Sequence, residues 1–172
     1  MQIIEGIKSR RSIRAYTDQQ ISKTDLQEII ECWMHAPSAR NQQAREFFII
    51  QSPEQKTLLA QQLKDGKYQT FVNQANSIIL TGFKQSEFTA PEFIQQDMWA
   101  CTQNILLATH NKGIGAVRVG IYPMYHSDQS LNTLLNIPTE VTIFNAIALG
   151  YPDNKLPLSE KKCIKPEKIH RL

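Results

Sequence analysis

The 172-residue sequence has few cysteines and no long apolar run. Its three cysteines, Cys32, Cys101 and Cys163, lie far apart and form no CxxC pair. Odd, scattered cysteines argue against a disulfide framework and a zinc site, so we expect reduced thiols. The longest apolar stretches, such as SIILTGF, fall well short of the ~20 residues that a membrane span needs. The N-terminus also lacks the apolar run of a secretory signal. These absences predict a soluble cytoplasmic protein that does not enter a membrane.

A strong excess of charge of one sign is missing as well. The formal net charge is +3, from 19 Lys and Arg against 16 Asp and Glu. A nucleic-acid-binding domain usually shows a denser basic face, so none is predicted as a partner. The four histidines show no metal-ligand spacing, and no Rossmann glycine fingerprint is present. The apolar and charged fractions are those of an ordinary globular protein. We therefore expect residues 1–172 to form one domain, in which residues 153–172 are an extended tail.

Hydrophobic periodicity predicts an α+β domain. Helices are expected over residues 2–9, 22–36, 53–66, 92–111 and 128–136, and strands over residues 46–51, 77–83, 114–122 and 142–152. We expect Ser22 to cap the second helix, the Ala36-Pro37 step to end it, and Gly66 to cap the C-terminus of the third. The strand at 46–51 is expected to be buried, and Trp33 and Trp99 to belong to the core.

The basic residues gather in KSRRSIRAY, residues 8–16, which holds four cations within seven positions. One interpretation is a solvated basic end of a helix. The other is an anion site, because an arginine side chain presents a planar fork of donors that suits phosphate. Ser12 adds a hydroxyl between the charges. From this stretch alone, both interpretations stand.

A second polar stretch is APSARNQQ, residues 36–43. Serine, asparagine and glutamine are common in loops that follow a helix, so the stretch needs no ligand to explain it. Its hydroxyl and carboxamides can also match a heterocycle that carries alternating C=O and N–H groups. Beside a phosphate site, such side chains suggest a nucleotide-like cofactor.

The order of these motifs is more specific than any one of them. RRSIRAY precedes a helix ending in APSARNQQ, and DMWACTQNILLATHNKGIGAVRVG (97–120) and NIPTEVTIFNAIALGYP (136–152) follow. From Ile3 to Pro152, and more weakly into the tail, the chain resembles the FMN-dependent nitroreductase family, as a short member. The resemblance implies an α+β sandwich around a central, mostly antiparallel sheet, and an intertwined homodimer with FMN at the interface.

The resemblance also implies which residues bind FMN. Those expected at the phosphate and ribityl side are Arg10, Arg11, Ser12 and Arg14, joined by a tail lysine, Lys161 or Lys162. Those expected to reach the flavin from the partner subunit are Pro37, Ser38, Ala39 and Asn41, with Gln43 supporting their loop. Lys67 is expected near the pyrimidine oxygens, and Val119, Gly120 and Ile121 beside the flavin N5 edge. His35 is a further candidate to face the flavin, although a histidine at a helix C-terminus needs no ligand.

One departure from the family pattern is clear. After APSxxNxQ the family usually continues with Pro-Trp, whereas this chain has Ala44-Arg45. Because the tryptophan normally packs the loop, Arg45 is expected to change dimer packing or access to the site.

The implied activity is that of an NAD(P)H-dependent FMN oxidoreductase. NADH or NADPH would supply hydride in a ping-pong cycle, and a nitroaromatic, quinone or activated alkene would accept it. The chemistry belongs to the flavin, so no catalytic side chain and no metal are expected. Alternatives are a relative with other chemistry (flavin breakdown, dehalogenation or an oxidase reaction), a flavin-binding regulatory or storage protein, and a non-catalytic module that binds a polyanion through RRSIR.

Overall fold

A computed structural model describes residues 2–63, 66–123, 129–153 and 165–171. The helices are α1 (Ile3–Ser9), α2 (Lys23–Met34), α3 (Pro53–Gln62), α4 (Gly66–Gln74), α5 (Ile94–Asn111) and α6 (Gln129–Leu135). The strands are β1 (Glu46–Ile50), β2 (Ser77–Lys84), β3 (Gly115–Gly120) and β4 (Val141–Gly150). Short 3-10 turns occur at η1 (Ala39–Asn41), η2 (Gln85–Glu87), η3 (Pro91–Phe93) and η4 (Pro166–Lys168).

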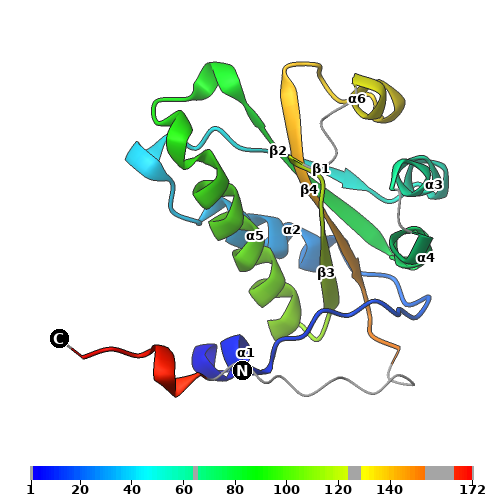
Figure 1. Ribbon diagram of the computed structural model, residues 1–172. Coiled ribbons are helices and arrows are strands. Elements are labelled where there is room, and N and C mark those ends of the chain that lie inside the picture. Colours follow the sequence, from blue (N-terminus) through cyan, green and yellow to red (C-terminus); the bar gives the residue numbers. More distant parts are fainter. Residues whose placement is uncertain (1, 64–65, 124–128, 154–164, 172) are drawn as a thin grey trace.

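The four strands form one antiparallel sheet in the order β1-β2-β4-β3. The helices α3, α4 and α6 cover one face of this sheet, and α2 and α5 cover the other (Figure 1). Both faces of β2 and β4 are therefore buried, which explains their continuous apolar sequences. The predicted α+β class and antiparallel sheet are confirmed.

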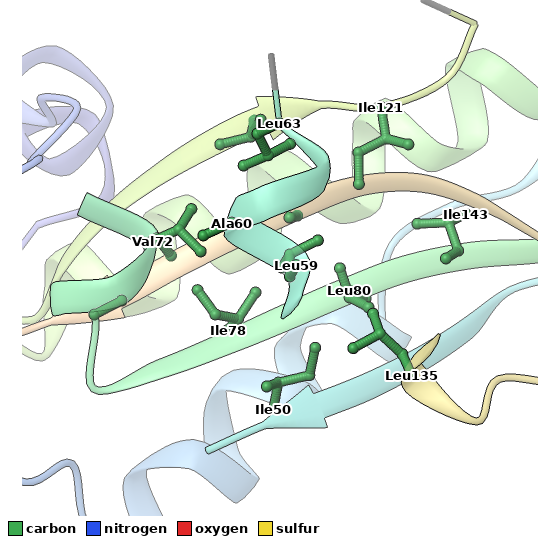
Figure 2. Packing of buried hydrophobic residues seen from close by; sticks show 14 of the residues in the cluster. Ile50, Leu59, Ala60, Leu63, Val72, Ile78, Leu80, Ile121, Leu135 and Ile143 are labelled. Atoms are coloured by element: carbon green, nitrogen blue, oxygen red, sulfur yellow. The ribbon is translucent and has the colours of Figure 1, made fainter. Parts of the chain in front are cut away.

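The core on the α3 and α4 side is built from aliphatic side chains of several elements. Figure 2 shows Leu59 of α3 and Val72 of α4 above Ile78 and Leu80 of β2. The core on the other side includes Trp33 of α2, as predicted, and Cys101 and Ile105 of α5. The α5 helix is the longest helix among the described residues, and none of those helices is long and apolar enough to cross a membrane.

The expected single helix over 53–66 is wrong. The helix α3 ends at Gln62, and Leu63 takes an extended conformation that buries its side chain in the core. Gly66 does not cap this helix; it begins the second helix α4. The missed signal is the spacing of Phe71, Val72 and Ala75, which puts three apolar side chains on one helical face.

The first strand is also less buried than expected. Ile50 is its one fully buried residue, and Ile49 is 42% exposed. The physical reason is its place at the edge of the sheet, where β1 pairs only with β2. An edge strand can be strongly apolar in sequence without both faces being covered.

The helix over residues 2–9 is confirmed as α1, and its apolar side is largely exposed. Ile3, Ile4 and Ile7 are 78%, 63% and 49% exposed. This contiguous set of isoleucines has the character of a surface that another molecule covers.

Candidate functional site

The segment that carries the arginines runs along the edge strand β3. The Ile13 N–H donates to the Ala116 carbonyl over 3.0 Å, and Ser12 forms a single parallel bridge with the same residue. Gly115 permits this close approach, because a Cβ at that position would lie 2.7 Å from the Ile13 side chain. The backbone of residues 12 and 13 is thus fixed against the sheet.

Tyr16 anchors the other end of the segment. Its hydroxyl lies 2.7 Å from the Ile13 carbonyl and 3.2 Å from the Ala148 carbonyl. The Tyr16 ring covers Gly150, where a Cβ would come within 2.8 Å of ring carbons. With Ile13 and Tyr16 packed inward, the side chains of Ser12 and Arg14 are exposed.

Arg10 and Arg11 differ in what their guanidinium groups contact. Arg11 Nη1 donates to the carbonyls at the end of α1, those of residues 8, 9 and 10, over 2.9–3.1 Å. Arg10 is half-buried, and its Nη1 atom is buried with no hydrogen-bond partner among the described residues. A buried donor without a partner is costly, so Arg10 marks a position where an acceptor is wanted.

Like charges lie close to one another around Arg10. Burial, and then the charge of Arg11, lower the pKa of Arg10. Burial, followed by the charges of Arg10 and Arg11, also lowers the pKa of His110, whose Nε2 lies 2.8 Å from Ser9 Oγ. These are conditions that a bound anion relieves.

The polar loop over residues 36–43 joins α2 to β1. Pro37, Asn41 and Gln43 are exposed, and Ser38 and Ala39 are half-buried. His35 is the C-cap of α2 and is also exposed. All the loop residues that the resemblance implicates therefore have surface that a ligand can reach.

At the end of β3, a ligand could contact backbone atoms but not the buried side chains. The Val119 and Ile121 side chains are buried in the core, at 2% and 1% exposure. Gly120 between them is half-buried, and a Cβ there would lie 2.8 Å from Arg118 Nη1. The Arg118 guanidinium stacks 4.2 Å from the centroid of Trp99. Trp99 is 44% exposed, so its expected place in the core is wrong.

Of the three lysines expected at the site, only Lys67 lies among the described residues. Lys67 is the second residue of α4, on the sheet face opposite to α5 (Figure 1). Lys161 and Lys162 lie outside the described residues. The roles expected for all three stay predictions.

A single chain does not bring the arginine segment and the polar loop together. The loop contacts the N-terminal part of α5, because the Ala39 N–H donates to Asp97 over 3.0 Å. The arginine segment meets the other end of α5, where Ser9 contacts His110. The helical rise separates Asp97 from His110 by about 20 Å along α5. The loop also leads into β1, the sheet edge opposite to β3 (Figure 1).

Arg45 stands where the family pattern has tryptophan, and its guanidinium binds the carbonyls at the end of α2. Its Nη1 donates to the Ala36 carbonyl over 2.9 Å and lies 2.9 Å from Cys101 Sγ. Its Nη2 donates to the Met34 carbonyl over 3.3 Å, and the guanidinium lies 5.6 Å from the Trp33 ring centroid. A cation here satisfies carbonyls that the helix end leaves without partners.

We expect Arg45→Ala to lower the free energy of unfolding by about 1–3 kcal/mol, because the Ala36 and Met34 carbonyls lose their donor. Thermal and urea unfolding, followed by circular dichroism, measure this change. Arg171→Ala, at an exposed arginine near the C-terminus, is the matched control and should leave stability unchanged. Equal stability of the two variants would contradict this role of Arg45.

The fold and this arrangement define an α+β sandwich with a basic segment along one sheet edge. The Nitroreductase family model matches residues 7–66 and 54–151, which together span most of the chain. The chain belongs to the nitroreductase family.

Individual relatives agree with this assignment. A protein of Archaeoglobus fulgidus with the provisional name NADH dehydrogenase/NAD(P)H nitroreductase is 34% identical over 169 residues, covering 98% of this chain and 96% of the relative. A Bacillus subtilis protein named FMN reductase [NAD(P)H] is 24% identical over 172 residues, covering 90% and 67%. A solved structure from Desulfovibrio desulfuricans, a provisionally named nitroreductase in complex with FMN, has a TM-score of 0.82 at 29% identity, covering 94% and 92%.

Proposed function

We propose that this chain is a single FMN-binding domain that acts as an NAD(P)H-dependent oxidoreductase. The observation that carries the proposal is the buried, unpartnered Nη1 of Arg10 beside Arg11 and His110. The phosphate of FMN would give Arg10 Nη1 an acceptor and place a negative charge beside these cations. Arg14 and Ser12, both exposed on the same segment, would complete the contacts to the phosphate and ribityl groups.

The polar loop and the end of β3 fit the ring of the cofactor. Ser38, Asn41 and Gln43 offer donors and acceptors for the heteroatoms of the flavin, and Lys67 is a candidate for its pyrimidine oxygens. Gly120 has no side chain, so the backbone of residues 119–121 could approach the N5 edge. A tail lysine, Lys161 or Lys162, would add charge at the phosphate.

When bound, FMN supplies the hydride chemistry, taking hydride from NADH or NADPH and passing it to a second substrate in a ping-pong cycle. The chain itself holds the cofactor, orients its ring and excludes water. A small electrophile such as a nitroaromatic, quinone or activated alkene is the proposed acceptor.

We also propose that the functional unit is a homodimer. The support is the distance between the two halves of the site within one chain, which lie at opposite ends of α5. A second copy can bring its polar loop to the arginine segment of the first. The exposed Ile3, Ile4 and Ile7 at one end of α5, and the half-exposed Phe93 and Trp99 at its other end, offer apolar side chains for such a contact.

Reconstitution with FMN tests the proposal. The purified protein, stripped of any flavin and mixed with FMN, should retain it through gel filtration at one FMN per chain. A protein that takes up no FMN but binds RNA with an affinity that falls steeply with salt would instead support the polyanion-binding alternative.

A further inference from the structure

The polar loop holds an unusual backbone conformation. Arg40, Asn41 and Gln43 all have positive φ angles, of 49°, 53° and 47°. None of them is glycine, and L side chains occupy this region sparsely because the Cβ crowds the backbone. Such conformations persist only where the surroundings enforce them. Hydrogen bonds within the loop, such as that from the Gln43 N–H to Ser38 Oγ over 3.2 Å, are joined by contacts from outside it.

The side chain of Gln42 is one part of that support. Its Oε1 accepts from the N–H groups of Thr89 and Ala90, over 3.2 and 3.0 Å. Its Nε2 donates to the Ala90 carbonyl over 3.2 Å and to Asp97 Oδ2 over 2.6 Å. The contacts from Thr89 and Ala90 fix the orientation of the amide, so that Nε2 faces Asp97.

Asp97 is the other part. It is 5% exposed, in the first turn of α5, where the helix dipole favours a negative charge. Its Oδ1 accepts from the Ala39 N–H over 3.0 Å, and its Oδ2 accepts from Gln42. Both groups that face Asp97 are donors, so the position needs two acceptors. A carboxylate supplies two, whereas an asparagine amide supplies one.

We infer that Asp97 and Gln42 are positioning residues, which hold residues 38–43 in the shape that receives the flavin. The pair links the polar loop to α5 and to the backbone at residues 89 and 90, and thereby sets Ser38, Asn41 and Gln43 before any ligand arrives. The inference rests on the proposed FMN site. It adds two buried or half-buried residues that need not touch the cofactor.

The donor and acceptor pattern gives a test by rescue. In Asp97→Asn, the new amide must turn its NH₂ toward either the Ala39 N–H or Gln42 Nε2, and both are donors. In Gln42→Glu, a second carboxylate faces Asp97. In the double variant Asp97→Asn/Gln42→Glu, the Asn oxygen accepts from Ala39 and its NH₂ donates to Glu. Only the contact to the Ala90 carbonyl is lost.

The dissociation constant of FMN for the stripped full-length protein is measured by quenching of flavin fluorescence. Each single variant is expected to raise this dissociation constant by about 10-fold or more. In each, a hydrogen bond is replaced by a contact between two donors or between two acceptors. The double variant should bind more tightly than either single variant, a non-additive result. Thr109→Val removes a buried hydrogen bond of α5 that does not involve the loop, and is the control; its FMN affinity should be unchanged.

Amide hydrogen exchange of residues 39–43 without FMN supplies a second readout, with faster exchange expected in the single variants and recovery in the double variant. Single variants that bind FMN as tightly as the wild type, or a double variant no better than the weaker single variant, would overturn the inference. If the wild type binds no FMN, the proposed function fails, and unchanged exchange in Asp97→Asn would separately reject the positioning role.

Discussion

Replacing Arg14 by alanine is expected to weaken FMN binding by about 10- to 100-fold, the loss of one charge-assisted contact to phosphate. The fold should be unaffected. The Arg14 side chain is exposed, and the segment is held by Ile13 and Tyr16 on either side. Isothermal titration of stripped protein with FMN measures the effect, and circular dichroism checks the fold.

Arg10→Ala and Arg171→Ala make this test specific. Arg10 carries the buried, unpartnered donor, so its removal should weaken FMN binding by a factor similar to that of Arg14→Ala. Arg171 is an equally charged but exposed residue near the C-terminus, and its removal should change nothing. Unchanged FMN content of Arg14→Ala and Arg10→Ala after gel filtration would reject the phosphate assignment.

Removal of FMN is expected to weaken the dimer. A ligand that binds only the assembled form stabilises that form by mass action, by about 2.7 kcal/mol per site when free ligand is 100 times its dissociation constant. The dimer dissociation constant should therefore be at least about 100-fold lower at that FMN concentration than without FMN. Analytical ultracentrifugation over a range of protein concentrations, with and without FMN, measures the shift.

The Arg14→Ala variant provides the control for this linkage. Because Arg14→Ala binds FMN more weakly, its dimer should be stabilised only at FMN concentrations that are higher by the same factor. A non-specific effect of flavin would stabilise the wild-type and variant dimers at the same concentration. A monomeric protein that carries one tightly bound FMN would contradict the shared site, since one chain separates Ala39 from the arginine segment.

Local patterns predicted most of the fold. The Ser22 cap is confirmed, because its hydroxyl accepts from the Asp25 N–H over 3.0 Å. The helical period of α5 and the continuous apolar sequences of β2 and β4 could also be recognised in the sequence, because α5 buries a regular face and both faces of the two strands are covered. The division between α3 and α4 was not, because the extended Leu63 is stabilised by core packing from distant segments.

The arginine run and the loop residues were recognisable as site candidates from the sequence, whereas their supports were not. Neither Asp97 nor Gln42 carries a local sequence signal that distinguishes it from other polar residues. Their roles depend on a contact across 55 positions of sequence, which no local pattern carries. The positive φ angles at Arg40 and Asn41 were equally hidden, because neither position has glycine.

Anaerobic titration of the FMN-loaded protein with NADH and with NADPH tests the central claim most directly. An FMN oxidoreductase should lose its visible flavin absorbance with at least one of the two donors, and adding a quinone or nitroaromatic should restore it. A protein that binds FMN stoichiometrically but keeps its absorbance with both donors would be a flavin-binding protein without this activity, which would contradict the account.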